Sequence, residues 1–380
     1  MSKSLLWMID SLGSGGAEHL MPGIMANISK EKFSQRVCVL QVREGNPVAK
    51  KIEALGFPVD FVGVPNLRYP KNIPNLLRYL RQHQPDIVHT QLEFSDTLGN
   101  LATKLLKIPS VSTLHTLDAP EKTDRTYWRH QLMWASLRYA ADRVISVSDS
   151  ARQQQIRAGS LSPEHIITLY NGIDLTPFAP EAHPHPQKIR EELDIHNDSF
   201  LMVSVAVLRK PKGIQYMLDA MPKILAAHPN AFYLVVGDGE NMTALQEKRR
   251  ALKLEKHVHF AGFRNDIAAI LAASDLFVHP TLNDALPTVL IEAMGAEKAL
   301  VASAVGGVPE LLEDRVNGIL IPPADTDALA KACLELIADP TRTAQMAKAG
   351  RKTANEKFSI ATQITKLENL YEELISLYEK

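Results

Sequence analysis

The six residues FLMVSV at positions 200–205 decide the fold, because with them a strand pattern that already runs through the first half of the chain begins again. The run is short and almost wholly apolar, as is typical of a strand buried on both faces of a parallel sheet. Helix-period segments such as 75–82 and 99–107 lie between runs of this kind. The alternation predicts parallel strands joined by crossover helices. The other expected strands are 5–9, 37–40, 87–89, 144–147, 232–236, 257–260, 276–278 and 300–302.

The two series of runs predict an α/β fold of two Rossmann-like, doubly wound domains that face each other across a central cleft. A chain of 380 residues is too long for one ordinary core and suits two domains. The proline-rich segment 177–187 is typical of a linker. We therefore expect an N-terminal domain over residues 1–176 and a C-terminal domain over residues 188–357. A helix at about 358–380 follows, and its apolar face must pack on another element.

The composition is that of an ordinary globular protein, with 45% hydrophobic and 22% charged residues. The two cysteines, Cys38 and Cys333, are too few and too far apart for a disulfide framework, which favours the reducing cytoplasm. No run approaches the roughly 18 apolar residues of a membrane span, and the apolar run at 5–9 is interpreted as a strand rather than a signal peptide. No zinc-type or RNA-binding pattern occurs, so we expect no nucleic-acid partner.

Charge is distributed unevenly along the chain. Residues 1–172 contain 20 lysines and arginines against 15 acidic residues, whereas the remainder contains 22 against 28. A basic N-terminal half favours an anionic partner such as a membrane surface or a lipid diphosphate, although a chance imbalance of solvated faces explains it equally well. Residues 122–143 combine basic and aromatic side chains, which suits a membrane interface or a lipid-linked acceptor. Core packing explains these aromatic residues just as well.

A glycine-rich turn, GSGGAE at 13–18, follows the first expected strand and precedes a helix. Glycine lets the backbone approach a ligand closely, and the N-terminus of a helix offers unpaired N–H groups to a phosphate. The third glycine of the dinucleotide fingerprint is missing, and so is an acidic residue near position 40, so NAD is disfavoured. The alternative is a tight turn that binds no ligand.

Polar residues follow several expected strands, at the edge where open α/β sheets place ligand-binding groups. His89 and His115 each come after such a run. His115 is the better candidate because polar residues flank it, and a purely structural, hydrogen-bonded role suits His89 better. The run RKPKG at 209–213 places cations beside a helix start, a combination that suits a diphosphate. Another glycine turn, at 237–239, follows a further strand.

The stretch TLNDALPTVLIEAMG at 281–295 carries the most information about function. Pro287 fits the first position of a helix, which leaves the next N–H groups free to meet an anion. Glu292 lies on an otherwise apolar helix, where a carboxylate is costly unless it is hydrogen-bonded, and ribose hydroxyls are suitable donors. Asp284 either faces a ligand or only complements the helix dipole.

In order and spacing these segments resemble glycosyltransferase family 4, a group of retaining enzymes with the two-domain GT-B fold. The likeness covers the whole chain through its Gly-Gly-Ala-Glu, Pro-Asp-Ile-Val-His, Asn-Gly-Ile-Asp, Lys-Gly, Gly-Asp-Gly, acid-x7-Glu and Gly-Gly-Val-Pro-Glu segments. It implies transfer from a nucleotide-sugar, UDP favoured over GDP, to the hydroxyl of a glycolipid or lipid-linked polysaccharide precursor. The last helix would pack back on the N-terminal domain. The enzyme would work in the cytoplasm, with peripheral contact to the inner face of the membrane.

The resemblance also implies roles for single residues. The position of Glu292 holds the nucleotide ribose, and that of Asp284 faces the donor sugar. The position of Lys212 contacts the diphosphate, and that of His115 lies near the sugar. The remaining expected contacts to the donor come from Gly15, Gly16, Gly237, Leu286, Pro287 and Thr288.

Two positions depart from the family pattern. Asp284 stands where the family has a glutamate, which is one methylene longer, and Val207 stands where it has a phosphate-binding arginine. We expect Arg209 to replace that arginine, because residues i and i+2 of an extended segment share a face. Arg209 therefore joins His115, Lys212 and Asp284 as an expected catalytic residue.

No metal or other cofactor is expected, since cations and helix N-termini are enough to stabilise a leaving diphosphate. The sequence DTD at 325–327 resembles the Asp-x-Asp metal motif of the other large glycosyltransferase fold. It opens an expected helix, so capping is the preferred interpretation. Two alternatives stay open: a sugar-nucleotide epimerase with the same fold, and a non-catalytic sugar-nucleotide-binding protein.

Overall fold

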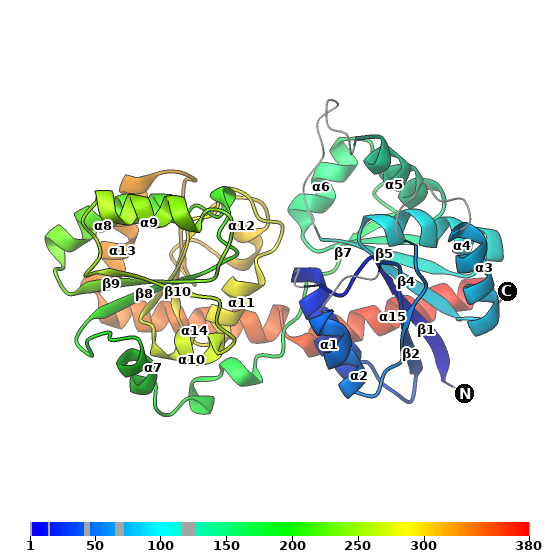
Figure 1. Ribbon diagram of the computed structural model, residues 1–380, viewed down its shortest axis with the longest axis horizontal. Coiled ribbons are helices and arrows are strands. Elements are labelled where there is room, and N and C mark those ends of the chain that lie inside the picture. The colour runs from blue at the N-terminus through cyan, green and yellow to red at the C-terminus, as the bar shows by residue number, and fades with distance from the viewer. Residues whose placement is uncertain (1, 14–15, 42–45, 65–71, 116–126, 380) are drawn as a thin grey trace. The chain divides into compact units, whose positions relative to one another are not determined.

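The computed structural model describes residues 2–13, 16–41, 46–64, 72–115 and 127–379. The chain forms two compact units (Figure 1): unit 1 comprises Met1–Gly172 and Ile360–Lys380, and unit 2 comprises Ile173–Ser359. Each unit is a parallel sheet with helices packed on it, so the predicted α/β class is confirmed. Gly15 and the segment 116–126, which includes two of the basic residues noted above, lie outside the described residues.

Unit 1 is built on a seven-stranded sheet with the order β3-β2-β1-β4-β5-β6-β7, and each adjacent pair is parallel. The strands are β1 (Lys3–Ile9), β2 (Phe33–Val39), β3 (Val59–Phe61), β4 (Ile87–Gln91), β5 (Ser110–Leu114), β6 (Arg143–Ser146) and β7 (Ile166–Thr168). The helices are α1 (Gly16–Asn27), α2 (Pro47–Ala54), α3 (Asn72–His83), the π-helix η1 (Ser95–Gly99), α4 (Asn100–Leu106), α5 (Tyr127–Tyr139), α6 (Asp149–Arg157) and α15 (Ile360–Tyr378).

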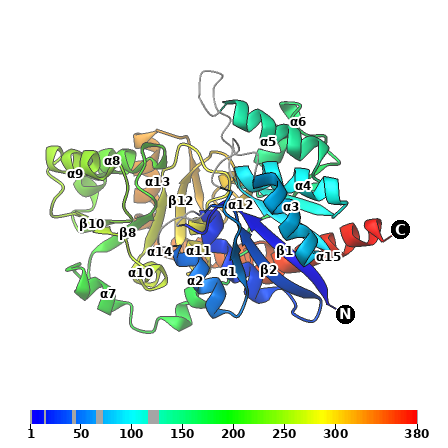
Figure 2. The same cartoon turned by 45° about the vertical axis from the view of Figure 1, so that its right-hand side comes forward.

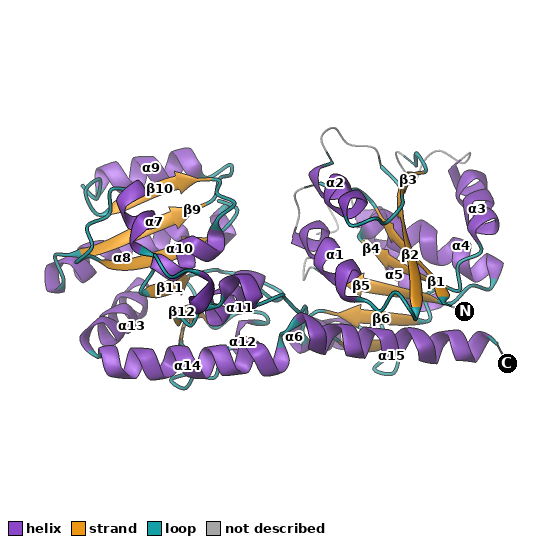
Figure 3. Ribbon diagram, turned by 90° about the horizontal axis from the view of Figure 1, so that it is seen from below, coloured by secondary structure: helices purple, strands orange, loops and turns teal. Residues whose placement is uncertain are grey.

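Strand β1 contributes to two cores, because successive residues of a strand face opposite sides of the sheet. Leu5, Trp7 and Ile9 pack with α1, α2 and α15 on one side, where Figure 3 shows α15 beside the sheet of unit 1. Leu6 and Met8 pack with α3 and α4 on the other side. Both faces of the sheet are therefore covered, and the ends of the strands are left to meet ligands.

Unit 2 has a six-stranded parallel sheet with the order β10-β9-β8-β11-β12-β13. Helices α8 and α9 lie on one side of β8 to β10, and α7 and α10 on the other (Figure 2). The strands are β8 (Phe200–Val205), β9 (Ala231–Val236), β10 (Val258–Gly262), β11 (Leu276–His279), β12 (Ala299–Ser303) and β13 (Ile319–Ile321). The helices are η2 (Thr176–Phe178), η3 (Pro180–Ala182), α7 (Gln187–Glu192), η4 (Lys210–Lys212), α8 (Ile214–Ala227), α9 (Met242–Ala251), α10 (Ile267–Ala273), α11 (Thr288–Gly295), α12 (Val308–Leu311), α13 (Thr326–Ala338) and α14 (Pro340–Lys357).

The proline-rich segment 177–187 is part of unit 2. Helix η2 contacts α10 and α11, and a Cβ placed on Gly295 of α11 would come within 2.8 Å of the Leu175 side chain. Glu181 of η3 forms an ion pair with Arg351 of α14 at 3.1 Å. The prolines therefore shape a short 3-10 connection that packs on the second unit, rather than a free spacer.

Helix α15 is joined to the sheet of unit 1 through the buried Tyr371. The Tyr371 hydroxyl lies 2.6 Å from His89 Nδ1, and His89 Nε2 lies 2.7 Å from Thr113 Oγ1. The imidazole also stacks on Trp7, with ring centroids 4.7 Å apart. Burial lowers the pKa of His89 to about 3, so the neutral ring donates at one nitrogen and accepts at the other. The structural role predicted for His89 is confirmed.

We expect Tyr371→Phe to destabilise unit 1, because it leaves one nitrogen of the buried His89 without a partner. The expected loss is about 1–3 kcal/mol of unfolding free energy, measured by thermal and urea unfolding. Tyr378→Phe is the matched control on the same helix, since its hydroxyl bonds Asp142 at an exposed position; its expected change is within about 0.5 kcal/mol. Equal losses in the two variants would contradict the assignment.

Candidate active site

In the sheet of unit 2, strands β9 and β10 follow on one side of β8, and the chain then crosses back to β11 on the other side of β8. Open α/β sheets bind ligands beyond the carboxyl ends of the strands at such a point. The loops after β8 and β11 touch through their backbones here, because Leu282 N–H donates to the Pro211 carbonyl at 2.7 Å. Gly213 has a φ of +73°, and a Cβ there would lie 1.7 Å from the Pro280 carbonyl oxygen. Only glycine fits this close approach.

The segment after β8 alternates between the core and the surface. Leu208 is fully buried, whereas Val207 is 55% exposed and Arg209 is also exposed. Arg209 has an extended backbone, with φ −117° and ψ 152°. The Arg209 N–H, however, donates to the Val207 carbonyl at 2.8 Å, so the chain turns tightly at Leu208 and is not the extended segment that the prediction assumed. The replacement of the usual arginine by Arg209 stays a prediction.

Lys212 and Asp284 meet at this edge of the sheet. Lys212 Nζ lies 2.6 Å from Asp284 Oδ2, and His279 Nε2 from the end of β11 lies 3.2 Å from the same oxygen. Burial favours the protonated acid, but the hydrogen bond and charge of His279, together with those of Lys212, outweigh it and lower the pKa of Asp284. Asp284 is thus an ionised carboxylate that contacts both the ammonium group of Lys212 and the imidazole of His279.

Helix α11 begins directly after this loop. Pro287 is the residue before the helix, with an extended backbone, so the prediction that it occupies the first helical position is wrong by one residue. The N–H groups of the first turn still lack acceptors within the helix. Leu286 is buried and Thr288 is partly buried at this start.

Glu292 lies one turn into α11 and is partly buried. Within the part of the chain that the structure describes, its carboxyl group has neither an ion pair nor a hydrogen bond. Burial alone raises the pKa of Glu292 to about 7. A carboxyl group in this state is stabilised by a ligand that donates hydrogen bonds to it.

Gly237 follows β9, on the other side of β8 from Asp284. Its φ is +127°, and a Cβ there would lie 1.9 Å from the Ala206 carbonyl oxygen. This close backbone contact by itself requires glycine. In unit 1, Gly16 is the first residue of α1, and a Cβ there would meet nothing within 4 Å among the described atoms.

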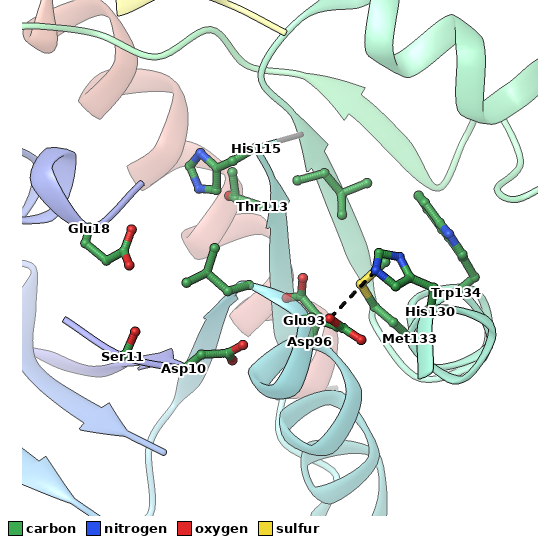
Figure 4. Close-up of a pocket in the computed structure, with 12 residues that line it drawn as sticks. Asp10, Ser11, Glu18, Glu93, Asp96, Thr113, His115, His130, Met133 and Trp134 are labelled. Atoms are coloured by element: carbon green, nitrogen blue, oxygen red, sulfur yellow. Dashed lines mark ion pairs between the residues drawn. The ribbon is translucent and has the colours of Figure 1, made fainter. Parts of the chain in front are cut away.

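Unit 1 contains a cavity of about 280 Å³ at the carboxyl ends of β1, β4 and β5 (Figure 4). In this sheet β2 and β3 follow on one side of β1, and the chain then crosses back to β4 on the other side of β1. The cavity therefore lies at a switch point, as the site of unit 2 does. The lining residues are Asp10, Ser11, Glu18, Leu92, Glu93, Asp96, Thr113, Leu114, His115, His130, Met133 and Trp134.

His115 lines this cavity just beyond the end of β5. Its Nε2 is buried and has no hydrogen-bond partner in the described structure, in contrast to both nitrogens of His89. Burial lowers the pKa of His115 to about 4, so the ring is neutral at pH 7. Of the two histidines, His115 is the one free to bind a ligand, which agrees with the preference drawn from its polar neighbours.

Several residues of these sites were not identified from the sequence. His279 ends β11, and Asp10 directly follows β1. Their positions after apolar runs were the available signal, since strand ends at this edge carry ligand-binding groups. Glu93 lies just before the π-helix η1, and Asp96 lies within it. Nothing in their local pattern distinguishes them from solvated charges.

Two family models match the chain in succession. The model for Glycosyltransferase Family 4 matches residues 15–177, and the model for glycosyl transferases group 1 matches residues 186–353. The chain belongs to glycosyltransferase family 4. The activity class expected from the sequence, transfer of a glycosyl group, is confirmed with it.

Relatives and solved structures agree with this family. The enzyme is 28% identical over 313 residues to the UDP-Gal:alpha-D-GlcNAc-diphosphoundecaprenol alpha-1,3-galactosyltransferase of Escherichia coli, which covers 80% of each chain. It is 29% identical over 314 residues to the alpha-maltose-1-phosphate synthase of Mycolicibacterium smegmatis, covering 77% of this chain and 79% of that one. The crystal structure of Anabaena HepE in complex with UDP has a TM-score of 0.86 at 24% identity, over 98% of this chain and 100% of that chain. The fold is GT-B.

The Asp-x-Asp segment of this glycosyltransferase caps a helix, as predicted. Asp325 accepts a hydrogen bond from the Ala328 N–H at 2.8 Å, at the start of α13. Among the described residues, no group of three or more His, Cys, Asp or Glu side chains is arranged to hold a metal ion. None of the helices in the described ranges is long and apolar enough to cross a bilayer.

The raised pKa of Glu292 predicts that this residue destabilises the ligand-free glycosyltransferase at high pH. The carboxyl group binds its proton more tightly in the folded chain than at its usual pKa of 4.5. Below that pH the group is neutral in both states, and stability falls as the pH rises through about 7. Glu292→Gln should therefore raise the unfolding free energy by roughly 1–3 kcal/mol at pH 8 and leave it unchanged at pH 4.

Urea unfolding at the two pH values measures this difference. Glu255→Gln, at an exposed position of the same unit, is the control and should show no dependence on pH. A gain that is equal at pH 4 and pH 8 would argue against an ionised, poorly solvated Glu292.

Proposed function

We propose that this glycosyltransferase moves a sugar from a UDP-sugar, with retention of anomeric configuration, to a hydroxyl group of a glycolipid or lipid-linked polysaccharide precursor. The observation that carries the proposal is the partly buried Glu292, which has no partner in the described structure. It lies one turn into α11, the helix that follows the loop with Asp284 at the switch point of unit 2. A nucleoside diphosphate offers what these residues need: ribose hydroxyls that donate to Glu292 and an anionic diphosphate for Lys212.

In this proposal the ribose hydroxyls donate to Glu292, which relieves the cost of its buried carboxylate. The diphosphate lies against the first turn of α11, at Leu286, Pro287 and Thr288, where free N–H groups and the helix dipole favour negative charge. The turn at Gly237 borders the same edge. The UDP complex of the Anabaena structure supports uridine as the base.

Lys212 and Arg209 stabilise the leaving diphosphate. Without a donor, the charge of Lys212 is balanced by Asp284, so a bound diphosphate competes with that carboxylate for the ammonium group. Asp284 and His279 then remain together to meet hydroxyl groups of the donor sugar. His115 of unit 1 is a neutral hydrogen-bonding group for sugar hydroxyls.

The bond from the anomeric carbon to the diphosphate breaks as the acceptor oxygen bonds the same face of that carbon. The acceptor proton passes to the departing phosphate. Charge develops on the leaving oxygen, and fixed cations and N–H groups stabilise it without a metal. This course is the one that the family resemblance favours, since no carboxylate of unit 2 is identified as a covalent nucleophile.

A screen for nucleotide release over UDP-, GDP- and ADP-sugars tests the proposal. We expect turnover with a UDP-sugar that rises when an acceptor is added and that persists in excess chelator. Release without any dependence on an acceptor would favour an epimerase or a hydrolase. Absence of release with every donor would favour a non-catalytic binding protein, and loss in chelator restored by Mn²⁺ would exclude the metal-free course.

Lys212→Ala should lower kcat/KM for the donor about 10²–10³-fold, the range for losing one group that stabilises transition-state charge. Arg209→Ala should weaken it by about tenfold, as for a single charge-assisted contact. Lys210→Ala is the matched control, because Lys210 is an exposed lysine of the same turn, and its effect should stay within about twofold. Unchanged donor affinity in Arg209→Ala would remove Arg209 from the site.

The proposed lipid-linked acceptor calls for a surface that meets a membrane. Met133 and Leu137 on one face of α5 are buried in the core of unit 1, whereas Trp128 and Leu132 are 76% and 57% exposed. Leu105 of the neighbouring helix α4 is 71% exposed. The cations Lys104, Lys107 and Arg138 lie at the C-terminal turns of these two helices. Exposed apolar side chains beside cations suit an anionic bilayer surface.

Flotation with anionic vesicles tests this surface. The chain should float with phosphatidylglycerol vesicles, and the triple variant Leu105→Ser, Trp128→Ser, Leu132→Ser should lose at least about tenfold in binding, since each side chain buries apolar area worth 1.5 kcal/mol or more. Phe263→Ser, which replaces a 72% exposed phenylalanine of unit 2, should change nothing. Equal flotation of all three proteins, or none by the parent chain, would rule the surface out.

A further inference from the structure

The cavity of unit 1 is acidic, although the N-terminal half of the sequence is basic overall. Carboxyl groups line it at Asp10, Glu18, Glu93 and Asp96, and no lysine or arginine is among the described residues that line it. We propose that this cavity receives an uncharged sugar residue of the acceptor, recognised through its hydroxyl groups, and that any phosphate of the acceptor stays outside it. The inference rests on the proposed transferase function and adds the chemical class of the acceptor.

Two buried side chains point to a ligand in the cavity. Nε2 of His115 and Nδ1 of His130 are inaccessible to solvent and have no hydrogen-bond partner in the described structure. Both rings line the cavity, and Figure 4 shows them on opposite sides of it, His115 near Thr113 and His130 near Met133. A buried nitrogen without a partner is costly, so a polar group is needed at each of these positions.

The four carboxyl groups are not equivalent. Asp10 accepts the N–H groups of Phe94 and Ser95 at 3.0 and 2.7 Å, and Asp96 accepts the Thr90 hydroxyl at 2.6 Å. These contacts fix both groups in the wall of the cavity.

Glu18 is left to meet a ligand, and Glu93 keeps acceptor capacity beyond its contact with Arg129. Glu18 is buried in the first turn of α1, and no ion pair to it is found among the residues described. Glu93 pairs with Arg129 and lies 3.8 Å from His130 Nε2. The free hydrogen-bonding capacity of the wall is therefore mostly that of an acceptor.

This arrangement selects against anions. A phosphate or a carboxylate in the cavity would lose part of its hydration and lie near Glu18, whose like charge repels it, whereas the charge of Glu93 is balanced by Arg129. A sugar hydroxyl donates to these carboxylates and, because it also accepts, satisfies either tautomer of the two histidines. An ammonium group only donates, so it satisfies the histidines less completely. Met133 and Trp134 supply an apolar wall for the C–H face of the sugar ring.

Trp134 provides a readout that does not depend on catalysis. The chain has three tryptophans: Trp7 is buried in the core and Trp128 is on the surface, so Trp128→Phe leaves Trp134 as the responsive one. We would titrate this variant with methyl α-D-glucopyranoside, the corresponding galactoside and the N-acetylglucosaminide. The matched charged probes are glucoside 6-phosphate, glucuronide and glucosaminide. Trp134→Phe in the same background must abolish the fluorescence change.

At least one neutral glycoside should bind about tenfold or more tightly than its 6-phosphate and its uronide. Glu18→Gln should reduce that ratio to about threefold or less, and Glu93→Gln should act in the same direction. Unfolding curves of both variants check that they fold, and the comparison among probes on the parent chain stands without them. The proposal is overturned if the chain prefers an anionic probe or the glucosaminide, or if it binds no neutral probe. It is also overturned if the ratio of neutral to anionic affinity is unaltered in both variants.

The outcome is separable from that of the transferase proposal. A chain that releases nucleotide from a donor but shows no response at Trp134 fails this inference alone. A chain that binds the neutral glycoside but turns over no donor fails the transferase proposal alone.

Discussion

The constraint on which the rest of this molecule depends is the burial of two parallel sheets on both faces. Strands such as β1 and β8 carry apolar side chains to either side, so helices must cover each sheet and no face is left for chemistry. Polar groups gather instead where strands end. Each sheet has a switch point, where the chain crosses back to the other side of its first strand: between β1 and β4 in unit 1, and between β8 and β11 in unit 2. Both candidate sites lie at these switch points.

The two sites differ in charge, and that difference accounts for how they divide the work in the proposed reaction. The edge of unit 2 presents Arg209 and Lys212 beside the start of α11, which suits a diphosphate. The cavity of unit 1 presents carboxyl groups, the neutral His115 and a buried nitrogen of His130, which suits hydroxyl groups. Net charge along the sequence suggested the reverse, a basic N-terminal half for an anionic partner. Charge at the surface of a domain and charge in its cavity are separate properties.

Close backbone contacts hold the unit 2 site in place. The loops after β8, β9 and β11 approach one another so closely that side chains do not fit at Gly213 and Gly237. The motif glycines thus have a packing role that needs no ligand, in addition to any contact with a donor. In unit 1 the link from Tyr371 through His89 to Thr113 connects the last helix of the chain to the floor of the cavity. Residues nearly 260 positions apart in the sequence, Thr113 and Tyr371, therefore share one hydrogen-bonded network.

The sequence by itself determined the fold class, because alternating apolar runs and helical periods leave few arrangements other than two doubly wound sheets. It also singled out Glu292, Lys212 and His115 as candidates, because their positions beside strand ends or on an apolar helix follow from local pattern. The short edge strands β3, β7 and β13, three residues each, were not predicted because so few residues carry no periodicity. Only the tertiary structure decided that His279 joins Asp284, that Glu18 and Glu93 line one cavity, and that Tyr371 holds His89. Those contacts join residues from separate strands and helices, and no local pattern encodes which strand ends become neighbours.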